Sequence, residues 1–73
     1  MFYFFKKGTE TLTCEVRTSA DGPGYDIVIT EPGGGVRVET HATSEAVHQR
    51  WLELLEGFQH QGWWGPHIHD GRS

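Results

Sequence analysis

A chain of 73 residues has room for one domain with a thin core, because a domain of this size buries only about 60% of the surface that its unfolded chain exposes. Six basic residues against ten acidic ones give a formal charge of -4, which disfavours nucleic acid as a partner. No apolar run reaches the roughly 18 residues of a membrane span, and residues 1–5 are too short for a signal-peptide core, so we expect a cytoplasmic protein with no membrane partner.

Four segments before residue 42 have the composition and alternation of β-strands. In the clearest of them, Leu12, Cys14 and Val16 alternate with polar residues, as in a strand with one buried face. Short connections rich in Gly and Pro separate the segments and favour an antiparallel meander over parallel pairing. The predicted strands are residues 1–6, 10–17, 25–30 and 36–40.

The fourth predicted strand alternates valines with charged residues. We expect Val36 and Val38 to face the core and Arg37 and Glu39 to face solvent, because apolar side chains are the ones that strands usually bury.

After His41 the hydrophobic period lengthens from two residues to three or four, which predicts an amphipathic helix. Thr43 or Ser44 can cap its start, and Gly62 can end it. The sequence therefore predicts an α+β domain over residues 1–62, a four-stranded antiparallel meander with one C-terminal helix packed on one face. Residues 63–73 are expected to form a partly packed tail with a flexible end. The apolar stripe of the helix is Val47, Trp51, Leu54, Leu55 and Phe58.

The first predicted strand is unusual because Phe2, Tyr3, Phe4 and Phe5 are all large and apolar. One helix covers only one face of the sheet, so two of these rings must lie on the opposite face. The tail, a second subunit or a ligand could cover that pair.

Trp63 and Trp64 form an aromatic pair between glycines just after the predicted helix. Tryptophan is rarely left in water, so the pair either folds back over the sheet or the helix end, or anchors a partner, since tryptophan is enriched among interface hot spots.

Near the C-terminal end of the sequence, His60, His67, His69 and Asp70 have ligand types that a transition metal could use. The spacing provides neither a cysteine partner nor a fixed fourth ligand, so we assign no metal site and no cofactor.

No catalytic residue is assigned either. A domain this small offers little concavity to desolvate an acid pair or a nucleophile, and a buried Cys14 would be inert. The triple glycine at 33–35 lacks the lysine and the following helix of a phosphate-binding loop.

Several stretches together resemble a group of short bacterial proteins of unknown function: the Phe-Tyr-Phe-Phe opening, Cys14-Glu15-Val16-Arg17, the run from Tyr25 to Gly33, and the closing Gly62-Trp63-Trp64-Gly65-Pro66. This resemblance spans nearly the whole chain and implies no activity. A weaker one, over the last two strands and the helix, is to the nucleic-acid-linked WGR module. The central Trp-Gly-Arg of that module is absent here, so no binding residue is carried over.

From these observations we expect a non-enzymatic protein-interaction module that binds an unknown protein or a second copy of itself. The alternative is weak single-stranded nucleic-acid binding by aromatic and basic side chains on the sheet face away from the helix, although acidic residues there would offset the charge. Metal binding by the histidine-rich tail comes third. The candidate interaction surface is Phe2, Phe4, Arg17, Arg37, Trp63 and Trp64.

Overall fold

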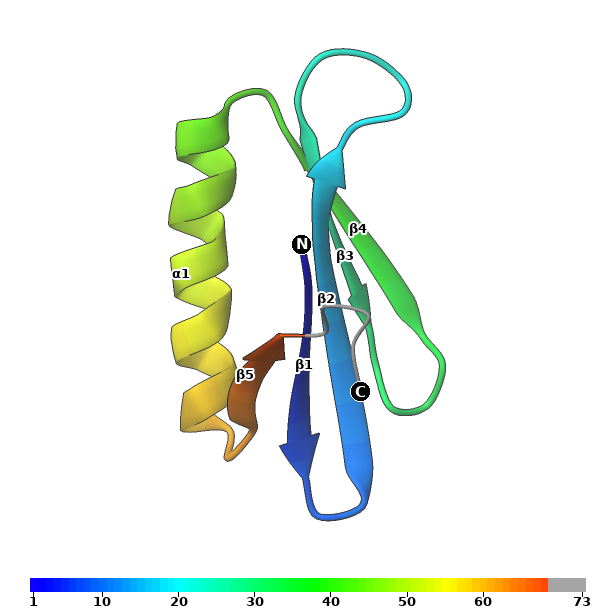
Figure 1. The fold of residues 1–73 in the computed structure, drawn as a ribbon, viewed down its shortest axis with the longest axis vertical. Helices are drawn as coiled ribbons and strands as arrows, with labels where there is room; N and C mark the ends of the chain where they lie inside the picture. Colours follow the sequence, from blue (N-terminus) through cyan, green and yellow to red (C-terminus); the bar gives the residue numbers. More distant parts are fainter. Residues whose placement is uncertain (69–73) are drawn as a thin grey trace.

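The structure, a computed structural model that describes residues 1–68, is an antiparallel five-stranded sheet with one helix against one face (Figure 1). The sheet order is β4-β3-β2-β1-β5. The predicted α+β class, antiparallel sheet and single helix are confirmed. Along the chain the elements are β1 (Phe2–Lys7), β2 (Glu10–Thr18), β3 (Tyr25–Thr30), β4 (Val36–His41), α1 (Ser44–His60) and β5 (Trp64–Ile68).

The prediction of four strands and a C-terminal helix is wrong, because the chain returns to the sheet after α1. The strand β5 pairs antiparallel with β1 and aligns His67 with Phe4 and Trp64 with Lys6. Part of the predicted tail is therefore a strand of the sheet. The remaining residues, 69–73, lie outside the described part of the chain.

The sheet pairing places Phe5 and the two isoleucines of β3 on the face that meets α1. Phe5, Cys14, Ile27 and Ile29 are fully buried there. From the helix, Val47, Leu54 and Phe58 complete the core, as the predicted stripe requires, and Trp63 joins it from beyond the helix end. The partly buried Val16, Tyr25, Trp51 and Leu55 pack around this cluster.

The helix begins where its sequence predicts. The hydroxyl of Thr43 accepts a hydrogen bond from the backbone N–H of Ala46 at 3.1 Å, which satisfies one of the free donors of the first turn. Glu45 adds a negative charge next to the positive end of the helix dipole.

The predicted facing of β4 is wrong. In the β3–β4 ladder Arg37 lies opposite Ile29 and Glu39 opposite Ile27, and opposite residues share a face, so the charged side chains point to the helix side. Val36 and Val38 point the other way and remain 58% and 54% exposed. The β3–β4 hairpin sets this register, and because side chains alternate along a strand, the register turns both valines away from the helix despite their apolar character.

A bulge lets β5 follow β1. The register shifts between Phe4 and Lys6, so Gly65 and Pro66 lie opposite the single residue Phe5. Gly65 has a φ of 151°, and a Cβ atom there would lie 2.9 Å from Cδ2 of Phe5 and 3.0 Å from the carbonyl oxygen of Phe4. Only glycine fits this position without displacing the buried ring.

Among residues 1–68, none of the helical structure is both long enough and apolar enough to cross a membrane.

Candidate functional site

The face of the sheet opposite to α1, which we call the outer face, carries most of the exposed apolar side chains. Its pattern follows from the strand registers, since residues directly opposite one another project to the same side. The outer face consists of Phe2, Phe4 and Lys6 from β1, Thr11, Thr13, Glu15 and Arg17 from β2, Asp26, Val28 and Thr30 from β3, Val36, Val38 and Thr40 from β4, and Trp64 and His67 from β5.

One end of the outer face is aromatic. The ring of His67 lies 5.0 Å from that of Phe4 and 4.4 Å from that of Trp64, measured between ring centroids. These contacts orient the indole of Trp64, yet 70% of this residue remains exposed. A large, oriented and exposed indole is the kind of side chain that anchors protein interfaces.

The opposite edge of the outer face is aliphatic. Val36 and Val38 project from β4 next to Thr30 and Val28 of β3, and threonines on β2 and β3 separate them from the aromatic end. Phe2, which is 38% exposed, lies between these two ends in the row of Glu15, Val28 and Val38.

The row of Arg17, Asp26 and Thr40, which crosses β2, β3 and β4 on the outer face, is polar and contains charges of both signs. Arg17 lies 3.7 Å from Glu15 and 3.8 Å from Asp26, measured between the charged nitrogen and oxygen atoms. Asp26 is buried and accepts a hydrogen bond from the hydroxyl of Thr40 at 2.8 Å. The positive charge of Arg17 is therefore offset by two neighbouring carboxylates, those of Glu15 and Asp26.

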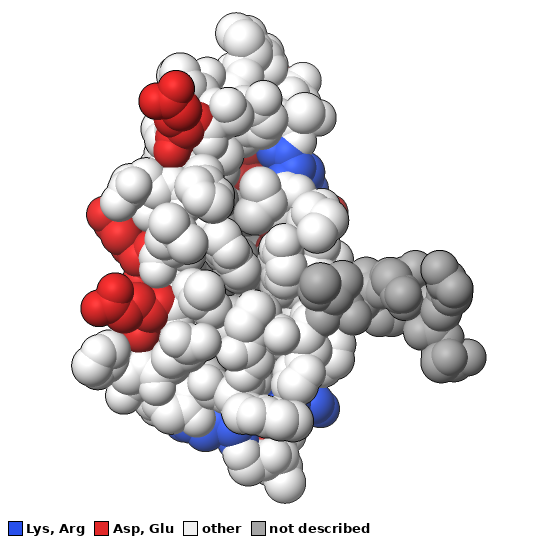
Figure 2. Space-filling model, turned by 60° about the vertical axis from the view of Figure 1, so that its left-hand side comes forward, with Lys and Arg blue, Asp and Glu red and all other residues white. Residues whose placement is uncertain are grey.

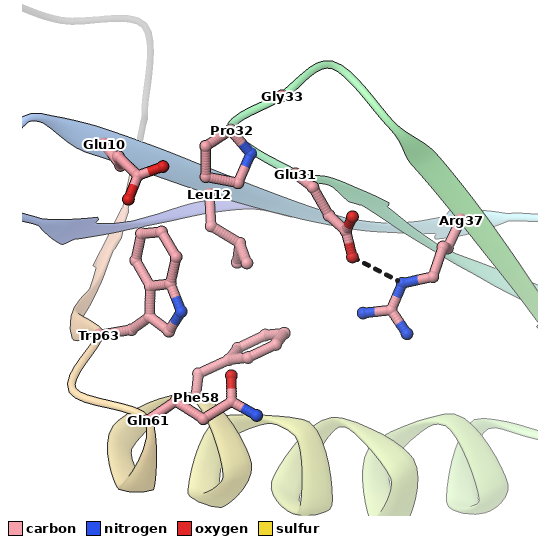
Figure 3. A pocket seen from close by; sticks show the side chains of 9 residues that line it. All are labelled: Glu10, Leu12, Glu31, Pro32, Gly33, Arg37, Phe58, Gln61 and Trp63. Carbon is pink, nitrogen blue, oxygen red and sulfur yellow. Dashed lines mark ion pairs between the residues drawn. The ribbon is translucent and has the colours of Figure 1, made fainter.

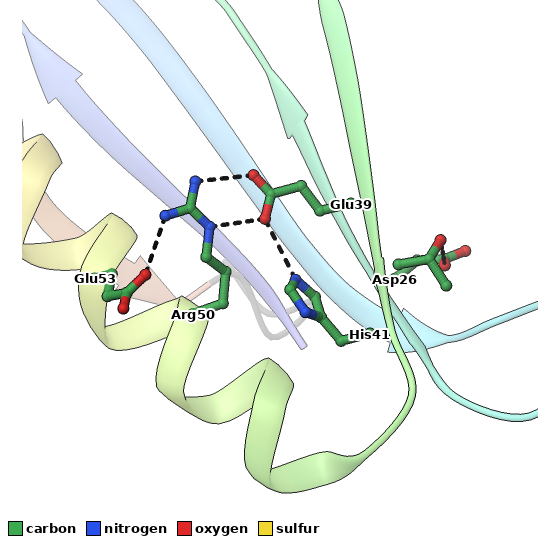
Figure 4. A network of polar contacts seen from close by, with 6 residues as sticks. Asp26, Glu39, His41, Arg50 and Glu53 are labelled. Carbon is green, nitrogen blue, oxygen red and sulfur yellow. Dashed lines mark hydrogen bonds and ion pairs between the residues drawn. The ribbon is translucent and has the colours of Figure 1, made fainter.

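A second polar cluster lies on the helix side of the sheet and fastens β4 to α1 (Figure 4). The guanidinium of Arg50 donates to both carboxylate oxygens of Glu39, at 2.8 and 3.0 Å, and to Glu53 at 3.2 Å. His41 lies 3.3 Å from the same Glu39 carboxylate. The hydrogen bonds from Arg50 hold the pKa of Glu39 below its ordinary value, and His41 adds to this effect.

Arg37 and Trp63 lie on the helix side of the sheet, where both line a hollow of about 280 Å³ near the end of α1 (Figure 3). Arg37 pairs there with Glu31 at 3.3 Å, and Trp63 is buried against the core with Lys7 5.1 Å from its ring centroid. The hollow is small and open, and its charges of both signs partly cancel. Its lining is Glu10, Leu12, Glu31, Pro32, Gly33, Arg37, Phe58, Gln61 and Trp63.

The exposed side of α1 is acidic. Figure 2 shows acidic side chains spaced along the helix side of the molecule, whereas basic side chains show only near the upper right and the bottom of that view. The exposed helix residues Glu45, Glu53 and Glu56 supply this charge. The apolar Leu52, which is 44% exposed, lies on this element and not on the sheet.

The six residues of the predicted interaction surface thus fall into two groups. Phe2, Phe4, Arg17 and Trp64 lie together on the outer face, whereas Arg37 and Trp63 lie on the helix side. The contribution of Val36 and Val38 was not predicted, because the apolar alternation of β4 favours an inward valine face, whereas the register turns it outward.

Cys14 is fully buried under α1, and this burial raises the pKa of its thiol to about 12, with a smaller contribution from Glu39. Within residues 1–68 no three His, Cys, Asp or Glu side chains come close enough together to hold a metal ion. Of the predicted tail ligands, His69 and Asp70 lie outside the described residues, and His67 is part of the aromatic end of the outer face.

Comparison of the chain with protein-family models, with curated proteins and with solved structures finds no match.

Proposed function

We propose that this chain is a small non-enzymatic protein-interaction module whose contact surface is the outer face. The observation that carries the proposal is the one-sided packing of the sheet. One helix occupies one face, while the opposite face presents Trp64, Val36 and Val38 with more than half of each residue exposed. Such a concentration of large apolar side chains is typical of interaction sites.

The arrangement fits a protein partner in its layout as well as its composition. An exposed tryptophan held by the ring of His67, which itself packs on Phe4, can fill a pocket on a partner. The valines of β4 extend the apolar contact across the sheet. The threonines and the paired charges between and beside them supply the polar part of the surface, as in interfaces with an apolar centre and a polar rim.

The same geometry favours protein over single-stranded nucleic acid. A nucleic-acid face needs cations free to meet phosphates, but Arg17 is held by two carboxylates and Arg37 lies on the helix side. Within residues 1–68, Lys6 is the other lysine or arginine on the outer face.

The proposal can be tested without a known partner. Peptides selected from a random displayed library for binding to the intact protein serve as the probe, and their affinities are then measured for the protein and for two variants. Trp64→Ser removes the anchor of the outer face, and Leu52→Ser removes an exposed apolar side chain of α1 as the matched control.

We expect Trp64→Ser to weaken peptide binding by at least about tenfold, as truncation of a hot-spot tryptophan does. Leu52→Ser should change it by less than about twofold, and added salt should have little effect. The proposal is wrong if no binding peptide is obtained, or if binding depends on Leu52 and not on Trp64. Binding of a single-stranded oligonucleotide that falls steeply with salt and is lost in Arg17→Gln would support the alternative.

A further inference from the structure

The edge strand β4 is open on one side. It is the first strand of the sheet order, and in the described part of the chain no strand pairs with its outer edge. The other edge, β5, contains Pro66 and a bulge, both of which discourage strand addition. The strand β4 has neither feature over its 6 residues.

The backbone of β4 is arranged for pairing on this side. The N–H of Glu31 donates to the carbonyl oxygen of Gly35 at 2.8 Å, which marks a hydrogen-bonded pair at the start of the β3–β4 ladder. Hydrogen-bonded pairs alternate along an antiparallel ladder, so Arg37 and Glu39 direct their backbone groups toward β3. Val36, Val38 and Thr40 direct theirs toward the open edge.

The charges on β4 are complementary to those on the β4 strand of a second copy. When two copies pair antiparallel about a two-fold axis at Val38, each Arg37 comes to lie opposite the Glu39 of the other copy, and Val36 lies opposite Thr40. Moving the axis to Arg37 or to Glu39 would instead place like charges opposite each other, which destabilises a strand pair. Charged side chains facing the covered side of an edge strand oppose most added strands. This register places no like charges opposite each other, and it adds a neighbour of opposite charge to Arg37, which pairs with Glu31, and to Glu39, which pairs with Arg50.

We propose that β4 binds the β4 strand of a second copy in this register and forms a continuous ten-stranded sheet with both helices on the same face. The outward backbone groups of Val36, Val38 and Thr40 would then bond across the axis. The two outer faces would join, with the valines of both copies at the seam. The inference rests on the proposed function only for the use made of the joined face, because the pairing itself depends on different residues.

Charge reversal tests the register. Solution mass is measured over a concentration series from about 1 μM to 1 mM for the protein, Arg37→Glu and Glu39→Arg, with circular dichroism to check folding. Each reversal alone places two pairs of like charges across the axis, so each variant should associate at least about tenfold more weakly than the protein. Mixing the two variants pairs every carboxylate with a guanidinium and should restore the dimer. Arg37→Lys, which keeps the charge, should leave it unchanged.

Cross-linking tests the axis and does not depend on Glu39→Arg folding without a partner for Arg50. In the proposed register the Cα atoms at position 38 of the two copies lie about 5.5 Å apart, within the range of a disulfide. At position 36 they are separated by about 13 Å along the strand. On mild oxidation, Val38→Cys should form a covalent dimer at least about tenfold faster than Val36→Cys, which has similar exposure and the same facing.

The inference is overturned if the protein is monomeric throughout the series, if Arg37→Glu associates as the protein does, if the mixture of folded variants stays monomeric, or if the two cysteine variants cross-link equally fast. A monomer that still binds selected peptides through Trp64 would remove the pairing and leave the proposed function standing. A dimer that passes these tests while Trp64→Ser leaves peptide binding unchanged would do the reverse.

Discussion

Glu39 of β4 and Arg50 of α1 form a two-pronged ion pair, at 2.8 and 3.0 Å, that ties the edge strand to the helix. We expect Glu39→Gln to lower the free energy of unfolding by about 1–2 kcal/mol, because hydrogen bonds to charged groups contribute about that much and this pair is only partly shielded from water. Glu53, which also binds Arg50 but is more exposed, provides the control. Urea unfolding of Glu53→Gln should differ from that of the protein by less than about 0.5 kcal/mol. Equal losses in the two variants would show that the pair does not fasten β4.

The same ion pair should make the free energy of unfolding decrease at acidic pH. Hydrogen bonds from Arg50 lower the pKa of Glu39 below 4.5, the value of a free glutamate. Because the folded pKa is the lower one, the stabilisation is fully present above the unfolded pKa and is lost as the pH falls through the folded pKa. The difference in unfolding free energy between the protein and Glu39→Gln should therefore shrink as the pH is lowered below 4.5. A difference that stays constant down to about pH 2 would contradict the lowered pKa.

The close packing at the bulge in β5 predicts that alanine has opposite effects on stability at Gly65 and at Gly57. Gly65→Ala should destabilise the fold by about 2 kcal/mol or more, because the new methyl group meets Phe5 and the φ of 151° is unfavourable for alanine. Gly57 lies within α1 with nothing within 4 Å of an added Cβ, so Gly57→Ala should stabilise the fold by about 0.5–1 kcal/mol. Thermal unfolding of both variants measures this difference. A tolerated Gly65→Ala would contradict the close approach of β5 to Phe5.

Cys14 should be chemically silent in the folded protein. Its burial removes access, and the pKa of about 12 leaves almost no thiolate at neutral pH. A thiol reagent such as iodoacetamide should modify the native protein at least about a hundredfold more slowly than the urea-unfolded chain. Rapid modification of the native protein would place Cys14 at the surface and contradict the core described above.

The sequence predicted the helix well because three independent signals agreed there. The hydroxyl cap at Thr43, the acidic first turn and the apolar stripe from Val47 to Phe58 all appear in the structure as expected. Local chemistry and tertiary packing favour the same conformation in this segment.

The sequence-based predictions were wrong for β4 and β5, where the local pattern is compatible with two structures. In β4 the valines suggested an inward face, but the register relative to Ile27 and Ile29 decides the facing, and a short hairpin sets that register. Glu39 and Arg50 could have been recognised as partners only with both elements already placed. The sequence after the helix predicted a tail and not a strand, although proline is also found at edge strands and bulges, and Pro66 of β5 is at both.

The predicted interaction surface is split between the two faces of the sheet because strand pairing, which the local sequence does not show, decides the facing of each residue. Trp63 and Trp64 are adjacent in the sequence and lie on opposite faces of the sheet, so one is 8% exposed in the core and the other 70% exposed on the outer face. Composition alone predicted that aromatic residues would matter there. The pairing of β5 with β1 determines which tryptophan can meet a partner.

The proposed contact between the outer face and a partner can be observed directly through the three tryptophans. A ¹H–¹⁵N spectrum records one indole N–H signal each for Trp51 against the core, Trp63 in the core and Trp64 on the outer face. On addition of a peptide selected for binding, we predict that the signal of Trp64 and the amides of Val36 and Val38 shift, while the signal of Trp63 and the amides of Glu45 and Glu56 stay in place. Shifts confined to α1 or to Trp63, with Trp64 unmoved, would contradict the account.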